Sequence, residues 1–259
     1  MAPVLGRVGP FLIYGYTAAL SLGFVLGVGL TAMLARRLAW ARPSLPWLDA
    51  ALVALAAALA GGRAGFVLQA WDYYQARPGQ IWEVWQGGLT YPGALLGGLL
   101  GVGVWLWVGK RPFWPTLGLL APAVAVVNVS GWLACWLEGC AYGRETVLTG
   151  SPWRDWLAAD LPDTYGVFAL RFQTQLLGGL GALLVLLLLL WLLRRSSPVA
   201  LTAVALLGIS LARLPLLPLR GDAPSPAAGW LDVGVAAAGL LLLQWAWRRR
   251  PAAHHDEEG

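Results

Sequence analysis

Leu183-Leu-Val-Leu-Leu-Leu-Leu-Leu-Trp191 is the centre of an apolar run, Gln175–Leu193, that contains no charged residue. A helix needs roughly 20 mainly apolar residues to cross the hydrocarbon core of a bilayer, and this run is long enough. Arg194 and Arg195 follow it directly, where long basic side chains can reach the membrane surface. The run therefore predicts a transmembrane helix.

Six further apolar runs of similar length predict six more spans. They are Phe11–Ala35, Trp47–Leu68, Gly88–Val108, Phe113–Leu137, Val199–Leu217 and Trp230–Trp247. Hydrophobic residues make up 58% of the chain and charged residues only 12%, about half the charged share of a typical soluble domain. The sequence predicts an all-α polytopic membrane protein with seven transmembrane helices, in a single domain over residues 1–259.

The loops between these spans alternate in charge, which predicts the orientation of the chain. More than half of the 18 lysines and arginines form four clusters on one side: Arg36, Arg37 and Arg42; Lys110 and Arg111; Arg194 and Arg195; Arg248, Arg249 and Arg250. The opposite loops hold most of the acids: Asp72, Glu83, Glu138, Glu145, Asp155, Asp160, Asp163, Asp222 and Asp232. Because short loops rich in lysine and arginine stay in the cytoplasm, we expect an N-terminus outside and a cytoplasmic C-terminus. The net charge of +5 then reflects membrane topology rather than a nucleic-acid surface.

The segments outside the predicted spans are short, with one exception. Residues 138–174, rich in Trp, Pro and Asp, predict an extracytoplasmic loop or small lid, and residues 248–259 predict a cytoplasmic tail. Many of the 16 tryptophans flank the spans, where their rings anchor a helix at the membrane interface.

Two glycine-rich patches lie at predicted span ends. One is Gly61-Gly62-Arg63-Ala64-Gly65; the other runs from Gly87 to Gly93 and continues to Gly97 and Gly101. Small residues four apart let membrane helices approach closely, so packing explains both patches. Open helix ends in such patches can also bind anions through free N–H groups.

Cys135 and Cys140 are the only cysteines, and both lie near the outer end of the fourth predicted span. They can form a disulfide in an oxidising compartment, or be buried as small hydrophobic residues, or take part in redox or acyl-carrier chemistry. A continuous helix would put residues five apart on different faces. A disulfide therefore requires the helix to end between them, and Gly139 is a residue that ends helices.

Charged side chains at membrane depth are costly and usually line a cavity or pathway. Arg63, Arg213 and Glu138 qualify, with Arg144, Arg171 and Arg220 at the margin. Arginines near span ends can also simply extend to the interface. If the five arginines gather on the outer half, their permanently charged, bidentate guanidinium groups would form a receptor for a phosphate.

Six pieces of this chain resemble, in order, motifs of the prolipoprotein diacylglyceryl transferase family, seven-span enzymes of bacterial inner membranes. The pieces are Tyr14-Gly15; Gly61-Gly-Arg-Ala-Gly-Phe-Val-Leu68; Trp85-Gln-Gly-Gly-Leu-Thr-Tyr-Pro-Gly93; Gly131-Trp-Leu-Ala-Cys-Trp-Leu-Glu-Gly-Cys-Ala-Tyr-Gly-Arg144; Arg171-Phe-Gln-Thr-Gln-Leu176; and the pair Arg213 and Arg220. They cover nearly the whole chain.

The chain also departs from the family pattern at five positions. Pro92 stands where the family has a histidine, Trp132 where it has an arginine, Cys135 where it has an asparagine, Cys140 where it has a glutamate, and Leu217 where it has a glutamate between the two late arginines. A Cys-containing variant of the family signature is closer to this chain.

The resemblance implies transfer of the diacylglyceryl group of phosphatidylglycerol to the lipobox cysteine of preprolipoproteins, a step of lipoprotein biosynthesis in the bacterial cytoplasmic (inner) membrane. It implies phosphatidylglycerol, the signal peptide and the lipid bilayer as partners of a monomer, with no nucleic acid, cofactor or metal. We assign catalytic roles to Tyr14, Glu138 and Arg213 on this basis. Head-group binding falls to Arg63, Arg144, Arg171, Gln175 and Arg220.

Two interpretations stay open for Glu138 and for the whole chain. Glu138 is either a proton acceptor or an interfacial carboxylate paired with Arg144. The chain is either an active transferase or a catalytically inactive relative that binds lipid or signal peptide. A transporter is a weaker interpretation, because no inverted repeat is visible.

Overall fold

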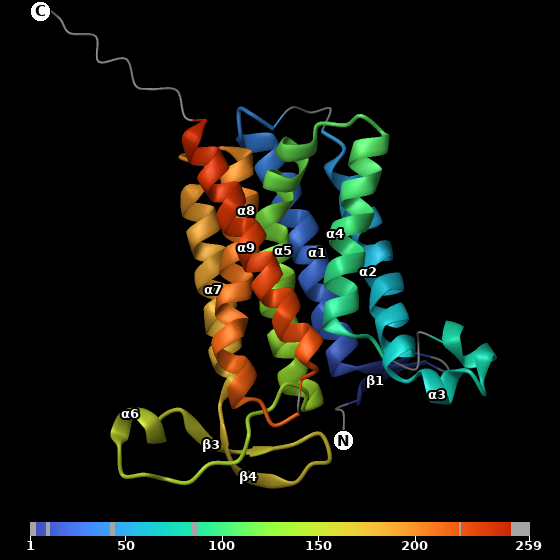
Figure 1. Cartoon of the computed structure of the whole chain (residues 1–259), viewed down its shortest axis with the longest axis vertical. Coiled ribbons are helices and arrows are strands. Elements are labelled where there is room, and N and C mark those ends of the chain that lie inside the picture. The colour runs from blue at the N-terminus through green and yellow to red at the C-terminus, as the bar shows by residue number, and fades with distance from the viewer. Residues whose placement is uncertain (1–3, 9–10, 42–44, 84–87, 223, 250–259) are drawn as a thin grey trace, which may run out of the picture.

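The computed structural model describes residues 4–8, 11–41, 45–83, 88–222 and 224–249 (Figure 1). Seven helices in this part of the chain are long and apolar enough to cross a membrane, which confirms the predicted fold class. They are α1 (Gly15–Arg37), α2 (Trp47–Gln69), α4 (Tyr91–Val108), α5 (Phe113–Glu138), α7 (Thr174–Leu192), α8 (Pro198–Arg213) and α9 (Pro226–Arg248). The 3-10 helix η3 (Leu214–Leu219) extends α8.

The helix ends differ from the predicted spans at three places with a local cause. The prediction that the first span begins at Phe11 is wrong, because β2 (Phe11–Tyr14) pairs antiparallel with β1 (Val4–Val8), and aromatic and β-branched residues favour strands. The third span begins at Tyr91 rather than Gly88. Pro92 lies in its first turn, where a missing N–H is tolerated, so Pro92 starts this helix and does not kink it. The sixth span tightens into η3, which contains Pro218.

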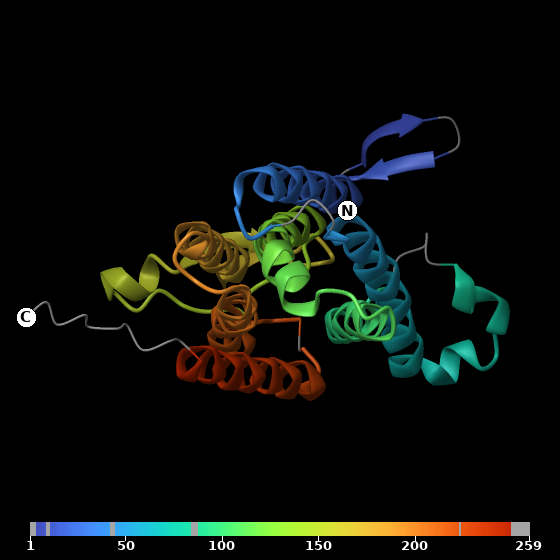
Figure 2. The same ribbon diagram turned by 90° about the horizontal axis from the view of Figure 1, so that it is seen from above.

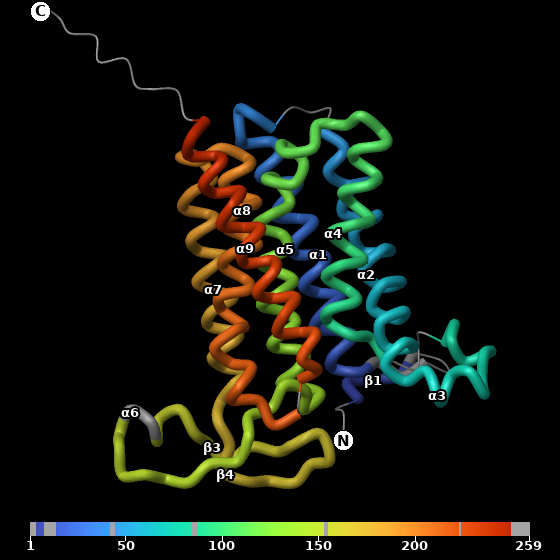
Figure 3. Tube along the Cα trace, viewed as in Figure 1, coloured from blue at the N-terminus to red at the C-terminus, as the bar shows by residue number. Residues whose placement is uncertain are grey.

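The chain crosses the bundle from end to end, as the trace in Figure 3 shows. At one end lie the C-terminal turns of α1, α4, α7 and α9, with the basic clusters that the structure describes (Figure 1). Arg42 and Arg250 belong to those clusters but lie outside the described residues, as does the tail from residue 250 to 259.

The opposite end carries the short elements. They are β1 and β2, α3 (Trp71–Tyr74), η1 (Pro78–Trp82), α6 (Pro152–Asp155) and the antiparallel hairpin of β3 (Ala158–Pro162) and β4 (Phe168–Phe172) (Figure 1). The predicted loop or lid at 138–174 thus contains α6 and the β3–β4 hairpin, and it begins at the last residue of α5.

The helices form two groups (Figure 2). Helices α1, α5, α7 and α8 share one apolar core, in which Leu119, Leu189 and Leu201 are fully buried. Helices α2 and α4 pack on each other through glycines: a Cβ added to Gly61 would overlap the backbone of Gly93 and Gly97. This is the close packing that the glycine patches predict. Gly87 of the second patch lies outside the described residues, as do Trp85 and Gln86 of the motif that overlaps it.

Candidate functional site

A buried ion pair joins two spans in the half of the bundle nearer the β3–β4 hairpin. Arg213, the last residue of α8, donates through Nε to Oδ2 of Asp232 in α9 at 3.3 Å. Asp232 has no exposed surface, and Arg213 is 9% exposed. The hydroxyl of Tyr91, the first residue of α4, donates to the other Asp232 oxygen at 3.1 Å. One carboxylate therefore connects α4, α8 and α9.

Two aromatic rings lie against the Arg213 guanidinium. Its Cζ is 3.4 Å from the centroid of the Tyr91 ring and 5.8 Å from that of Trp132 in α5. Such cation–π contacts are attractive, and more so away from water. Trp132 is buried tightly against α7, since a Cβ added to Gly178 would overlap its indole. The Nη groups of Arg213 form no hydrogen bond in the described part of the chain, so they stay available to an anion.

A disulfide closes the chain at the end of α5, within the motif 131–144. Cys135 and Cys140 are bonded, with Cα atoms 4.6 Å apart. The helix ends at Glu138, and Gly139 has a left-handed φ of 75°, which turns the chain so that Cys140 N donates to Cys135 O at 2.9 Å. Of the interpretations open for the two cysteines, the disulfide is the one observed.

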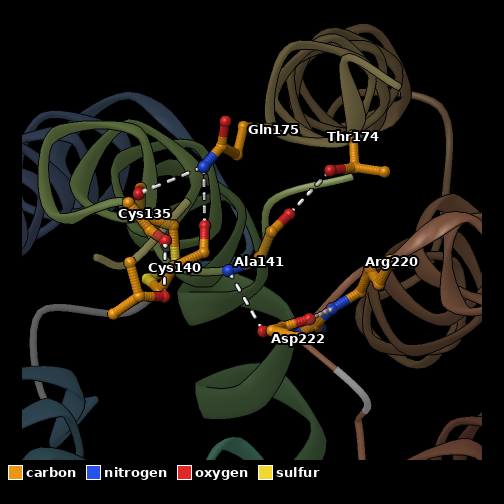
Figure 4. Close-up of polar contacts among 9 residues, drawn as sticks. Cys135, Cys140, Ala141, Thr174, Gln175, Arg220 and Asp222 are labelled. Atoms are coloured by element: carbon orange, nitrogen blue, oxygen red, sulfur yellow. Dashed lines mark hydrogen bonds and ion pairs between the residues drawn. A yellow bond between two sulfur atoms is a disulfide. The ribbon is translucent and has the colours of Figure 1, made fainter. Parts of the chain in front are cut away.

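Side chains from α7 hold the loop that the disulfide closes (Figure 4). The amide of Gln175 donates to the carbonyl of Cys140 at 2.7 Å and to that of Cys135 at 3.4 Å. The hydroxyl of Thr174 donates to Ala141 O at 2.6 Å. Ala141 has a φ of 53°, so these contacts hold a backbone conformation that residues other than glycine rarely adopt.

Asp222 links the same loop to Arg220 (Figure 4). Its carboxylate accepts two hydrogen bonds from Arg220, at 2.8 and 2.6 Å, in the bidentate geometry that arginine favours. It also accepts the backbone N–H of Ala141 at 3.2 Å. The charge of Arg220 is thus balanced within the protein.

Arg171 is likewise balanced by acids. Its Nη2 lies 3.1 Å from Glu145 and 3.3 Å from Asp163, and its Cζ lies 5.1 Å from the Tyr142 ring centroid. Backbone N–H groups, that of Val167 first, lower the pKa of Asp163, and Arg171 lowers it further. The four side chains fix the β3–β4 hairpin to the segment that follows α5.

Arg63 is bound to backbone carbonyls. Its guanidinium donates to Gln80 O at 2.6 Å, Ile81 O at 2.8 Å and Gly88 O at 3.4 Å. It also lies over the rings of Tyr74 and Phe66, at 5.3 and 5.9 Å. These contacts hold η1 and Gly88 against α2.

Arg144, Glu138 and Tyr14 are the predicted residues with the fewest partners. Arg144 is exposed, with a cation–π contact to Phe172 at 5.7 Å and no ion pair in the described chain, so the expected pairing with Glu138 is not observed. Glu138 is half-buried, and its Oε2 is buried without a hydrogen-bond partner among the described residues. It interacts electrostatically with Tyr16 of α1. Tyr14, at the end of β2, is 41% exposed.

The predicted residues therefore form several separate groups rather than one receptor. Arg213 has its own cluster; Gln175 and Arg220 hold the disulfide loop; Arg171 holds the β3–β4 hairpin, and Arg63 holds η1. Within the described chain, no three His, Cys, Asp or Glu residues come close enough to hold a metal.

Sequence reasoning did not assign the partners of these residues, among them Tyr91, Asp222 and Asp232. Counting Asp232 among the loop acids is wrong, because it is buried within α9. A signal was present, since an acid inside a predicted span is costly unless it has a partner. The ion pair of Asp222 with Arg220 could also have been predicted, because the two residues are only two positions apart in the sequence.

Known proteins resemble this chain over nearly its whole length. A family model described as prolipoprotein diacylglyceryl transferase matches residues 3–247. The phosphatidylglycerol–prolipoprotein diacylglyceryl transferase of Synechococcus elongatus is 28% identical over 95% of this chain and 87% of the relative. Those of a Nostoc species and of Aromatoleum aromaticum are 30% and 31% identical, over 96% and 97% of this chain and 91% and 97% of the relatives.

Proposed function

The chain belongs to the prolipoprotein diacylglyceryl transferase family, and we propose that it transfers the diacylglyceryl group of phosphatidylglycerol to the lipobox cysteine of preprolipoproteins. The observation that carries this proposal is the similarity to enzymes named for that activity along nearly the full length of both chains.

The reaction sets two requirements for the protein. The cysteine sulfur attacks the carbon of the diacylglyceryl group that is bonded to the phosphate, the carbon–oxygen bond breaks, and glycerol phosphate leaves with the bonding electrons. The thiolate is the reactive form of the cysteine, so the thiol proton needs an acceptor. Negative charge on the leaving phosphate oxygen needs a positively charged neighbour in a site that excludes water.

Arg213 and Arg144 are best suited to hold the phosphate. Arg213 offers both Nη groups at membrane depth, because Asp232 occupies only its Nε. Arg144 is exposed, and its charge has no acidic partner among the described residues. Their charge is permanent, and a guanidinium matches the geometry of a phosphate.

The other predicted head-group ligands take a different role in this proposal. Arg63, Arg171, Gln175 and Arg220 each bind backbone carbonyls or acids of the protein. They hold the segments that surround the site in place, and substrate contact falls to the residues with open donors.

Glu138 is proposed as the proton acceptor. Its Oε2 is buried and accepts no hydrogen bond from the described residues, so it can accept a proton without losing a partner. Tyr14 precedes Tyr16, the electrostatic neighbour of Glu138, by two residues, so Tyr14 and Glu138 lie at the same end of the packed α1 and α5. A hydrogen bond from the Tyr14 hydroxyl to the incoming peptide is the role we propose for that residue.

We propose that the N-terminus and the hairpin end face outward, that the C-terminus is cytoplasmic, and that the protein is a monomer of the bacterial inner membrane. The separation of basic and acidic loops supports this orientation. The disulfide supports it as well, since it lies at the end assigned to the oxidising side.

A transfer assay tests the proposed function. Purified protein, phosphatidylglycerol vesicles and a lipobox peptide are incubated, and the peptide mass is measured. We expect a diacylglyceryl group on the thiol, and a loss of about 100-fold in rate for Arg213→Ala. Arg77→Ala, which removes an exposed arginine that lies over the Tyr73 ring, is the matched control and should keep the wild-type rate.

The alternative function is a family member that binds lipid or signal peptide without catalysis. Trp132 favours it, because an indole fills the position of a family arginine. If the peptide binds the protein but its mass does not change in the transfer assay, this alternative is established and the proposed enzymatic function is contradicted.

A further inference from the structure

We propose that Asp232 is a positioning residue for Arg213, and that Tyr91 completes this arrangement. The inference rests on the proposed function, in which Arg213 binds the phosphate. It assigns no contact with substrate to Asp232 itself.

The burial of Asp232 is the first reason. A fully buried carboxylate in a membrane span is costly, and Asp232 has no exposed surface. Carboxylates inside membrane spans usually pair with a positively charged group, and here Asp232 pairs with Arg213 at 3.3 Å. A buried ion pair is weak evidence for stability, so a functional reason is the better explanation.

The geometry of the contact is the second reason. Asp232 accepts from Nε, the donor closest to the backbone, and so leaves the Nη groups open. The Tyr91 ring lies 3.4 Å from Cζ and packs against the guanidinium. Carboxylate and ring together fix both the direction and the plane of the donors. A guanidinium held in this way keeps its two-pronged geometry for a phosphate without ordering on binding.

The source of the carboxylate is the third reason. Position 217, between Arg213 and Arg220, is a leucine, so η3 brings no acid to Arg213. The carboxylate comes instead from α9, and Tyr91 bonds it from α4, 141 residues away along the chain. Residues from α4 and α9 thus contact and orient the guanidinium that α8 supplies, which is the arrangement expected of a preorganised binding group.

A double-mutant cycle on the full-length protein tests the proposal. The variants are Asp232→Asn, Arg213→Ala and the two combined, measured in the transfer assay with varied phosphatidylglycerol. Asp49→Asn is the matched control, since Asp49 is an exposed acid in the first turn of α2. Tyr91→Phe keeps the ring and removes the hydroxyl, with Tyr73→Phe as its control. Thermal unfolding of each variant shows whether it is folded.

If Asp232 acts through Arg213, Asp232→Asn lowers kcat/KM at least tenfold in a folded protein, and the combined variant is no worse than Arg213→Ala alone. Asp232→Glu should recover part of the loss, because it restores the carboxylate. Tyr91→Phe should cause a smaller loss of the same kind. Additive losses, or a wild-type rate for folded Asp232→Asn, would overturn the proposal.

A wild type that transfers nothing would refute the proposed function and leave the positioning of Arg213 open to a second readout. Retention of phosphatidylglycerol is then measured by native mass spectrometry for the same variants. Equal and non-additive losses in the two single variants support the positioning role. Retention by Asp232→Asn that equals wild type contradicts it.

Discussion

Asp163 shows how a single carboxylate holds the β3–β4 hairpin. It accepts the backbone N–H groups of Tyr165 and Val167, at 2.8 and 3.0 Å, and pairs with Arg171. These contacts favour its charged form, so its pKa is lower in the folded protein. The stability that it contributes is complete above the ordinary aspartate pKa of about 3.9 and is lost as pH falls through the lowered folded value.

We therefore predict that the turn at 163–167 stays closed at pH 5 to 7 and opens in strong acid. Asp163→Asn should open it already at neutral pH, because an amide cannot replace the charge that faces Arg171. Amide hydrogen exchange of this turn at several pH values measures both effects. Identical exchange in wild type and variant at pH 7 would contradict the prediction.

Which residues could be assigned from the sequence depended on how far apart partners lie along the chain. The resemblance singled out Arg213, but its partners, Tyr91 and Asp232, come from other spans and meet it only in the folded bundle. Gly139, by contrast, was readable, because a glycine between two cysteines predicts the helix end that the disulfide needs.

At the scale of elements, the contact of α2 with α4 depends on a run of glycines. A Cβ added to Gly97 would overlap the backbone of Ala57 and Gly61, whereas one added to Gly103 in the same helix meets nothing within 4 Å. The two helices can approach closely only because these positions lack side chains.

We predict that Gly97→Leu destabilises the protein by about 1–3 kcal/mol, because the added side chain must push α2 and α4 apart. The same shift would move Tyr91, at the start of α4, away from Asp232, so transfer activity should also fall. Gly103→Leu is the control and should match wild type. Thermal unfolding in detergent measures the first effect, and equal melting of the two variants would exclude this packing.

The spans themselves were predictable because length and hydropathy determine them. The errors came where apolar residues are not helical. Phe11–Tyr14 are as apolar as the span that follows, and hydropathy alone cannot tell a strand from a helix in so short a run.

At the scale of the whole molecule, the two ends of the bundle differ in charge and in structure. Basic residues gather at the end where α9 terminates, and the hairpins and the disulfide lie at the other (Figure 1). The sequence predicted which loops share an end, because successive loops lie at alternate ends of the bundle once the spans are counted. Thiol labelling from outside the cell tests which side of the membrane each end faces.

We predict that a cysteine introduced at Gly150, in the segment before α6, is labelled by a membrane-impermeant thiol reagent in intact cells. One introduced at Lys110, between α4 and α5, should be labelled only after the membrane is broken. The native cysteines do not interfere, because both are in the disulfide. The reverse pattern would invert the proposed topology.

The disulfide also has a consequence for the order in which the protein matures. Its two cysteines lie at the end of α5, whereas Gln175 and Asp222, which bind the closed loop, belong to segments that follow it in the chain. In the proposed orientation, the loop reaches the oxidising compartment during synthesis before its partners are inserted. We expect the disulfide to form first and fix the conformation of the loop, so that α7 and the segment after η3 then pack against an already closed loop. A host that lacks thiol oxidation on that side of the membrane would then produce a chain that inserts normally but in which Gln175 and Asp222 bind this loop poorly.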